Sequence, residues 1–215
     1  MTFEVHKESY KGLTIRIEAE EYPESPCEMW EDLGTMVCCH RNYNLGHEQA
    51  DVDTINEIAQ DKGNIVLPLY LYDHSGLTIS TGSFSCPWDS GQVGIIYVSK
   101  EKVRKEWGVK RISPKLHKQI VACLEGQVET YDDYLTGNVW GYTVEDEDGE
   151  VLDSCGMFYG DWETDSGCLD EARMAAKWIA KDRIATHCSK VKQWIKGKVP
   201  FQYRTACPIV GGSIG

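Results

Sequence analysis

Three pairs of short segments constrain the fold of this 215-residue chain, because apolar and polar residues alternate along each of them. Successive side chains of a strand point to opposite faces, so alternation predicts strands with one buried face. A few turn-forming residues separate the members of each pair, which is typical of a β-hairpin. The pairs are 3–8 with 13–20, 65–72 with 77–81, and 139–145 with 150–159. Pro68 cannot donate a ladder hydrogen bond, so we expect it at an edge or a bulge.

Four helices and two further strands are expected around these hairpins. Each helix starts at a Ser or Asp whose side chain can accept a hydrogen bond from the first turn. The expected helices cover 51–62, 100–107, 113–135, and a long stretch that begins after Asp165 or Ser166 and ends before Gly197. The added strands are 35–40 and 93–98. The last helix carries an apolar stripe made of Ala172, Ala175, Ala176 and Ile179, continued by Ile184, Cys188, Val191 and Ile195.

This order of elements predicts an α+β fold, in which antiparallel hairpins form a sheet packed against three or four helices. The apolar fraction of 41 %, with seven Trp and eleven Tyr, is sufficient to close a core. The length suits a single domain over residues 1–205, followed by a Gly-rich flexible tail over 206–215.

The formal net charge of −12 narrows the classes of partner. DNA, RNA and anionic membranes repel an acidic chain, so we expect a cationic partner, or an acidic balance that only keeps the protein soluble. No apolar run approaches the roughly 18 residues of a membrane span, and the charged start does not resemble a signal peptide. The nine cysteines include no C-x-x-C pair, so reduced and mostly buried thiols are expected.

The charges are segregated along the chain. Residues 129–171 hold fourteen Asp or Glu and no Lys or Arg, whereas residues 172–204 hold nine Lys or Arg against Asp182 alone. Because a helix favours acids in its first turn and bases in its last, helix chemistry accounts for part of this reversal. Two acidic groups are left over, one at the tip of the third hairpin and one in the loop before the last helix.

These two groups form the predicted partner-binding site. Charges also gather at exposed turns without any function, but carboxylates on a rigid hairpin can imitate backbone phosphates and compete for a cationic groove. Aromatic residues near them are of the types that anchor protein interfaces. The site residues are Glu145, Asp146, Glu147, Asp148 and Glu150, with Asp161, Glu163 and Asp165 beside them.

Two other constellations give alternative functions. Cys86 as nucleophile and His74 as base, with Asp89, suggest a cysteine-dependent hydrolase, although the same residues also suit tight turns. Residues 100–118 carry eight Lys or Arg against two Glu, which suggests a nucleic-acid-binding accessory protein or the solvated face of two helices.

No metal site is predicted from the sequence. Cys38, Cys39 and His40 are adjacent, but successive strand residues point to opposite faces. Asp161, Glu163 and Asp165 alternate as in a calcium loop, yet the glycine falls at position seven and the closing Glu is missing. A weak surface divalent cation is the alternative at these acids.

Two segments resemble uncharacterised proteins of bacteriophages and other bacterial mobile elements. The first, within 70–106, contains H-S-G-L-T-I-S-T and F-S-C-P-W-D-S-G-Q-V-G-I-I-Y-V-S-K-E, and the second is G-Y-T-V-E-D-E-D-G-E-V-L-D-S-C-G-M-F-Y-G. The likeness spans about half of the chain and carries no catalytic residue across. It implies an accessory protein in the cytoplasm of a bacterial host, of the kind that blocks a defence system.

The leading hypothesis is therefore a non-enzymatic anti-defence protein of the anti-CRISPR or anti-restriction type that acts as a DNA mimic. It would present its acidic surfaces to the basic groove of a host nucleic-acid-binding complex. No cofactor and no membrane partner are expected, direct binding to nucleic acid is disfavoured, and the oligomeric state is left open.

Overall fold

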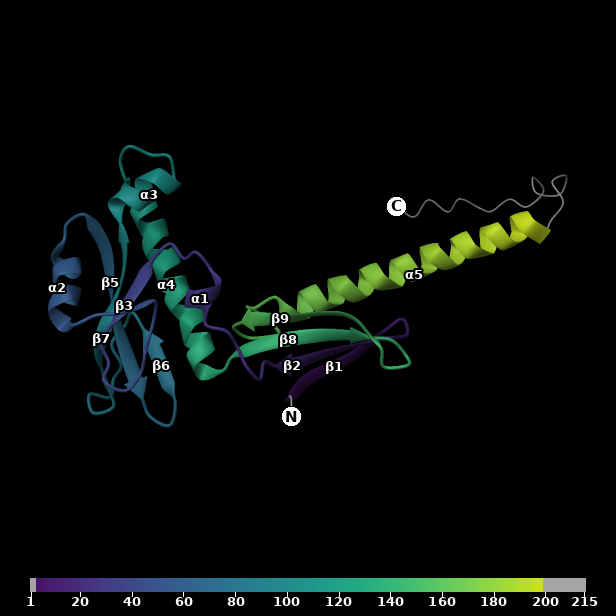
Figure 1. Cartoon of the computed structure of the whole chain (residues 1–215), viewed down its shortest axis with the longest axis horizontal. Helices are drawn as coiled ribbons and strands as arrows, with labels where there is room; N and C mark the ends of the chain where they lie inside the picture. Colours follow the sequence, from purple (N-terminus) through teal and green to yellow (C-terminus); the bar gives the residue numbers. More distant parts are fainter. Residues whose placement is uncertain (1–2, 199–215) are drawn as a thin grey trace.

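The computed structural model describes residues 3–198, which form nine strands in two sheets and five helices. The predicted α+β class is therefore confirmed. The strands are divided between two sheets rather than gathered in one, and Figure 1 shows a helix lying between them.

The first sheet has four antiparallel strands in the order β1-β2-β8-β9. Their bounds are β1 Glu4–Tyr10, β2 Leu13–Ala19, β8 Val139–Glu145 and β9 Val151–Tyr159. The first and third predicted hairpins thus pair side by side, although about 120 residues separate them in sequence. One face is covered by the start of α5 (Cys168–Lys198), and Ile15 and Ile17 of β2 are fully buried beneath Ala172 and Ala176.

The second sheet has five strands in the order β4-β3-β7-β5-β6. Their bounds are β3 Thr35–Cys38, β4 Glu48–Gln49, β5 Asn64–Asp73, β6 Leu77–Ser80 and β7 Ser90–Ser99. Only β3 and β4 pair in parallel among the described strands. Central strand β7 is buried on both faces, as its continuous apolar run predicts.

Helices cover both faces of the second sheet. Their bounds are α1 Pro26–Met29, α2 Val52–Gln60, α3 Lys100–Glu106 and α4 Pro114–Thr136. The predicted caps are present, since the side chains of Asp51, Ser99 and Ser113 each accept a hydrogen bond from the backbone of the following turn. Gly137, at a φ of 76°, ends α4 in the left-handed conformation that glycine adopts without strain.

Helix α4 has its apolar face buried along nearly its whole length. Leu116, Ile120, Leu124, Val128 and Tyr131 lie at helical spacing and pack against the second sheet. The C-terminal end of α4 reaches the first sheet at β9 (Figure 1), so this helix joins the two sheets.

Helix α5 behaves differently along its length. Its buried residues are Cys168, Leu169, Ala172, Ala176 and Ala180, all in the first half. From residue 181 to residue 198 every residue is exposed except the half-buried Ile195, and Figure 1 shows this part extending past the end of the sheet. The helix also continues through Gly197, where the sequence predicts its end.

The remaining expectations have mixed outcomes. Pro68 lies in the part of β5 that β6 does not pair with, next to an irregularity at Leu69/Tyr70, so its predicted place at an edge or bulge is confirmed. The apolar contacts divide over two sheets with separate clusters, and one cooperative domain over 1–205 stays a prediction. The expected tail 206–215 lies outside the described residues. No helix within residues 3–198 is long and apolar enough to cross a bilayer.

Candidate partner-binding surfaces

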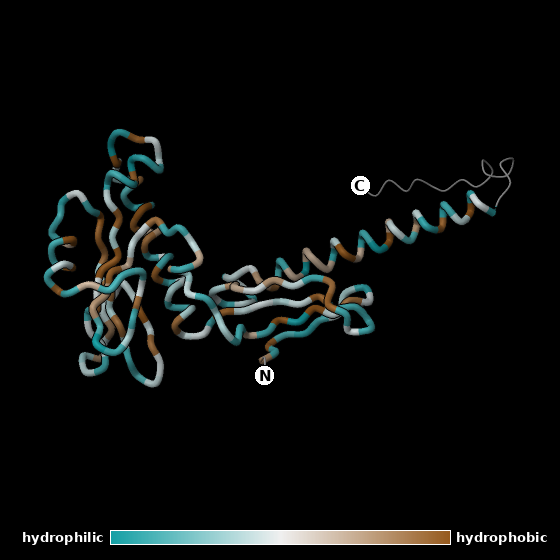
Figure 2. The backbone as a smooth tube through the Cα atoms, viewed as in Figure 1, coloured by the Kyte–Doolittle hydropathy of each residue, from teal (hydrophilic) through white to brown (hydrophobic). Residues whose placement is uncertain are grey.

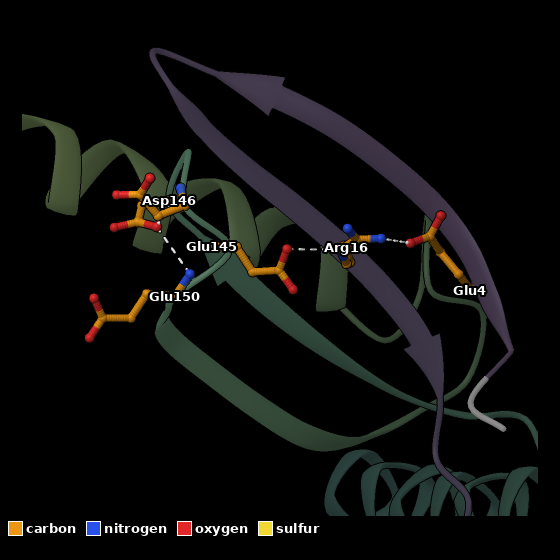
Figure 3. Close-up of polar contacts among 6 residues, drawn as sticks. Glu4, Arg16, Glu145, Asp146 and Glu150 are labelled. Atoms are coloured by element: carbon orange, nitrogen blue, oxygen red, sulfur yellow. Dashed lines mark hydrogen bonds and ion pairs between the residues drawn. The ribbon is translucent and has the colours of Figure 1, made fainter.

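The tip of the β8–β9 hairpin carries five of the predicted site residues, and two of them are engaged inside the molecule. Glu145 faces Arg16 of the neighbouring strand β2, with an Nε–Oε2 distance of 3.0 Å, and Arg16 also contacts Glu4 (Figure 3). The two carboxylates raise the pKa of the Arg16 guanidinium through hydrogen bonds, Glu145 first. Because its charge is matched within the sheet, Glu145 offers little to a partner.

Asp146 shapes the turn itself. Its Oδ1 accepts hydrogen bonds from the backbone N–H groups of Asp148 and Glu150, each at 3.0 Å, and Figure 3 shows the bond to Glu150. Its Oδ2 accepts from Arg183 of α5 at 3.3 Å. These bonds lower the pKa of the Asp146 carboxyl, the one to Glu150 most. Asp146 is therefore a turn-forming residue that also ties the hairpin to α5.

The carboxylates that face solvent at this tip are Glu147, Asp148 and Glu150. Glu147 lies over the β1–β2 turn, and its Oε1 is 2.7 Å from the position that a Cβ on Gly12 would occupy. A side chain at Gly12 would displace the Glu147 carboxylate, so the two hairpin turns lie close together.

The second predicted group, in the loop before α5, does not lie beside the first. Val139 pairs with Tyr159 at one end of the hairpin, and Glu145 pairs with Val151 at the other. The six residue steps between them correspond to about 20 Å, so one compact partner site cannot include both groups. This corrects the expectation that the two acidic groups are neighbours.

Within that loop Asp161 also has a structural role. Its Oδ1 accepts from the backbone N–H groups of Glu163 and Thr164, both at 2.9 Å, and from the Thr164 hydroxyl at 3.0 Å. These bonds lower the pKa of the Asp161 carboxyl, with the Thr164 hydroxyl as the largest cause. Glu163 and Asp165 are exposed and available to solvent.

A groove of about 930 Å³ lies where α4, β6 and this loop meet. Asp161 and Asp165 line it together with four acids of α4, and no Lys or Arg is among its lining residues. The α4 acids are Glu125, Glu129, Asp132 and Asp133. Their spacing of four and then three or four residues places them on one face of the helix.

Two of these α4 carboxylates are held in unfavourable surroundings. Burial raises the pKa of Asp132, although its Oδ1 accepts from the Ile79 backbone N–H at 2.7 Å. Burial also raises the pKa of Asp133, to which the charge of Asp165 adds, while Asn138 donates to its Oδ1 at 2.8 Å. A cation in the groove would offset both the cost of burying these two carboxylates and their repulsion by neighbouring acids. The groove is therefore electrostatically suited to a positively charged ligand group.

The three residues of the alternative hydrolase site, Cys86, His74 and Asp89, lie close together, but the base does not contact the nucleophile. Asp89 Oδ2 lies 3.5 Å from Cys86 Sγ and 3.4 Å from His74 Nδ1, so the carboxylate stands between the thiol and the imidazole. A general base must contact the nucleophile itself, and here the imidazole contacts the carboxylate instead. The three residues therefore form a hydrogen-bonded turn more readily than a catalytic set.

The basic segment 100–118 forms α3 and the start of α4 at one end of the second sheet. Two of its lysines bind backbone carbonyls, Lys100 that of Lys62 and Lys102 that of Asp32 at 2.7 Å. The other six basic residues are exposed, namely Arg104, Lys105, Lys110, Arg111, Lys115 and Lys118. This corner is remote from the acidic groove, which lies at the opposite end of α4.

One cluster with metal-binding side chains was not predicted from the sequence. Among residues 3–198, Cys27, Asp32 and His47 place their ligand atoms within 4.8 Å of one another. The Nδ1 of His47 accepts the Met36 backbone N–H at 3.0 Å, so the neutral ring carries its proton on Nε2, 3.2 Å from Asp32 Oδ2. A metal would need that Nε2 lone pair, and burial raises the pKa of the Cys27 thiol to about 12. The contact with Asp32 lacks hydrogen-bond geometry, so the buried Nε2 is left without a hydrogen-bond partner among the described residues.

The adjacent Cys38 and Cys39 point apart, as predicted, since Cys38 is buried and Cys39 exposed. His40 stacks on Tyr43 instead of turning toward either thiol.

The α4 acids are the residues that sequence reasoning missed at the groove. The signal that points to them is their helical spacing, with Asp132 and Asp133 near the C-terminal end of α4, where the helix dipole disfavours acids. Comparison with protein-family models, with curated proteins and with solved structures found no match to this chain.

Proposed function

We propose that this protein is a non-enzymatic inhibitor that binds a strongly cationic surface, such as the nucleic-acid-binding groove of a host defence complex. The observation that carries the proposal is the groove between α4, β6 and the 161–165 loop, which gathers six carboxylates and no basic lining residue. The resemblance to mobile-element proteins supplies the biological setting, a CRISPR or restriction type of target in a bacterial cytoplasm.

The roles of the acidic residues differ in this proposal. Glu125 and Glu129 are exposed on α4 and would contact basic side chains of the target directly. Asp165 would do the same from the opposite wall. Asp161 would act through the loop that it shapes, and the exposed tip residues Glu147, Asp148 and Glu150 would form a separate, weaker contact.

Charge is expected to dominate both affinity and rate. Complementary fields accelerate encounter, and exposed charges are screened over about 8 Å at physiological ionic strength. Inhibition should therefore weaken steeply as salt rises. Partly desolvated carboxylates such as Asp132 should retain more of their effect than exposed ones.

The test uses purified CRISPR effector and restriction complexes, with DNA binding followed by gel shift in the presence of this protein. The wild-type chain should block DNA binding at low salt. The double variant Glu125→Lys with Glu129→Lys should lose at least about tenfold in potency, because two attractive contacts become repulsive.

A matched control separates the groove from bulk charge. Glu57→Lys with Glu106→Lys makes the same change in net charge at exposed positions on α2 and α3. This control should retain inhibition. Equal losses in both double variants would reduce the effect to net charge, and failure of the wild-type chain to block any complex would overturn the proposal.

A further inference from the structure

The corner that α3 forms with the start of α4 concentrates positive charge in an otherwise acidic chain (Figure 1). This basic corner, residues 100–118, holds eight Lys or Arg against Glu101 and Glu106, a local net charge of +6 in a chain whose total is −12. Lys62 joins it from the turn before β5, because its backbone carbonyl accepts a hydrogen bond from Lys100 Nζ. Figure 2 shows hydrophilic stretches broken by short hydrophobic ones at this corner. A field of one sign is thus confined to one end of the second sheet.

Two lysines of the basic corner occupy positions that helix stability does not favour. Lys115 lies in the first turn of α4, Lys118 follows it closely, and both are exposed. The helix dipole disfavours cations there, but the same dipole strengthens the field that an anion meets. About 25 Å of helix separates Lys115 from Asp132 in the acidic groove, and exposed charges are screened over about 8 Å at physiological ionic strength. The acidic balance of the whole chain therefore does not govern this corner.

A cleft of about 540 Å³ opens at the basic corner, between α3 and the loop that joins α1 to β3. Lys102 of α3 donates a hydrogen bond from Nζ to the Asp32 carbonyl at 2.7 Å and so joins the two walls. Trp30 and Trp107 both line the cleft, and they are 47 % and 40 % exposed. Aromatic faces that stay half open to solvent are surfaces on which nucleic-acid bases stack.

The polar groups of the cleft suit a base better than a phosphate. Glu31, Asp32 and Glu106 line it, and their carboxylates repel phosphate oxygens but accept hydrogen bonds from the amino groups of a base. The exposed Lys and Arg side chains of the basic corner lie outside this lining, on the surrounding surface. The arrangement thus separates a place for a base from a place for the phosphate backbone.

We propose that the basic corner and its cleft bind single-stranded nucleic acid. A base stacks on Trp107 in the cleft, and the neighbouring phosphates lie on exposed lysines such as Lys115 and Lys118. Proteins that bind single strands combine these two elements, a positively charged track and aromatic stacking platforms. An unpaired strand is required, because a base in a duplex would have to leave its stack and its partner before entering the cleft.

Fluorescence anisotropy tests binding of the full chain to labelled single-stranded DNA and RNA of about 12 nucleotides, a length that covers one site of this kind. At about 50 mM salt the dissociation constant should be micromolar. Each phosphate contact on a single strand contributes about −0.7 to the slope of log affinity against log salt, so four contacts should give a slope of about −3. The same sequence as a duplex should bind more weakly.

Variants separate the phosphate contacts from the stacking contact. Lys115→Glu with Lys118→Glu should lower affinity at least about tenfold and make the salt slope shallower. Trp107→Ala should lower affinity about fivefold or more and leave the slope unchanged, because stacking releases no counterions. The matched controls lie on α5, where Lys177, Trp178 and Lys181 are exposed. Both Lys177→Glu with Lys181→Glu and Trp178→Ala should retain wild-type affinity.

Photo-cross-linking locates the base without any substitution, and so applies even if Trp107→Ala fails to fold. A strand that carries iodouridine should attach to the peptide that contains Trp107 or to the one that contains Trp30, as identified by mass spectrometry.

Three results would overturn the inference. They are no binding of either strand at about 100 µM protein and low salt, tighter binding of the duplex than of the single strand, and equal losses in the corner and α5 lysine variants. Binding to anionic vesicles with none to oligonucleotides would assign the corner to a membrane surface instead. The site uses no residue of the acidic groove, so Glu125→Lys with Glu129→Lys should not weaken strand binding, and the two activities can fail independently.

Discussion

Helices α4 and α5 carry opposite arrangements of charge. Helix α5 has Asp170 and Glu171 in its first turn and Lys196 and Lys198 in its last, as the helix dipole favours. Helix α4 begins with Lys115 and Lys118 and ends with acids, and it has no acid in its first turn and no base in its last. The charge distribution along α5 stabilises that helix through its dipole. The reverse distribution along α4 destabilises the helix.

The two helices also differ in burial. Helix α4, of 23 residues, packs along its apolar face and can tolerate unfavourable charges because the core holds it in place. Helix α5, of 31 residues, is buried only in its first half and depends more on local stabilisation. Residues that lower stability but persist are candidates for function, so the comparison directs attention to the acids of α4.

The largest difference between the helices should appear when their apolar side chains are shortened. Leu124 of α4 is fully buried, and Leu124→Ala should lower the free energy of unfolding by about 2–5 kcal/mol through lost burial and a cavity. Met174→Ala in α5, where the side chain is 55 % exposed, should change it by less than about 0.5 kcal/mol. Urea denaturation measures both, and similar losses would mean that α5 is packed more tightly than its exposure indicates.

A smaller effect should follow from releasing α5 from β1. Arg173 donates two hydrogen bonds to Glu8, at 2.9 and 2.8 Å, and lowers the pKa of Glu8 to about 2. Because both side chains are partly exposed, Arg173→Ala should cost only about 1 kcal/mol.

The pH dependence of this pair has a defined sign. The folded-state pKa of Glu8 lies below its ordinary value of 4.5, so the stabilisation is complete above that value and is lost as pH falls toward 2. Denaturation of the wild-type chain and Arg173→Ala between pH 7 and pH 2 should give two curves that converge at acid pH. A gap that persists at pH 2 would assign the loss to packing of the Arg stem.

Neutralising an acid at the end of α4 should raise stability. Asp132→Asn keeps the acceptor for the Ile79 N–H and removes a carboxylate whose pKa burial raises. At pH 7 the gain should be about 0.5 kcal/mol, and it should disappear below the ordinary pKa of 3.8, where the carboxyl is protonated in both the folded and unfolded chain. Thermal denaturation at the two pH values checks this. If Asp132→Asn instead destabilised the protein at pH 7, the acids at the end of α4 would not be unfavourable, and the two helices would not differ in this respect.

Neutralising an acid at the start of α5 should lower stability rather than raise it, and this effect should be the smallest of those predicted. Asp170→Asn removes a favourable charge from the first turn and should lower stability by about 0.3 kcal/mol at low ionic strength. The loss should shrink in 1 M salt, where screening acts within about 3 Å. A loss unchanged by salt would indicate a specific contact rather than the helix dipole.

Much of the secondary structure was predictable because its signals are local. Alternation located all three hairpins, and the caps at Asp51, Ser99 and Ser113 located the starts of three helices. The short strand β4 was not predicted, because two residues carry no usable periodicity. The end of α5 was misplaced because Gly197 is only a weak helix breaker.

The candidate site was less predictable, because proximity between distant segments has no local signal. Asp161 and Asp165 were identified, but the acids of α4 that share their groove were not. Glu145 and Asp146 were chosen as partner contacts, yet Arg16 and the turn backbone use their carboxylates. An acid's availability depends on which bases and N–H groups the fold brings to it.

By itself the sequence determined the α+β class, the hairpins, the capped helices and the long apolar stripe of α5, because each of these arises from periodicity or from hydrogen bonds within a few residues. Tertiary structure alone decided that the strands form two sheets, that the two acidic groups lie at opposite ends of one hairpin, and that residues 3–198 bury only half of the α5 stripe. These outcomes depend on which surfaces meet across long sequence separations, and burial and pairing energies set them only when the whole chain is folded.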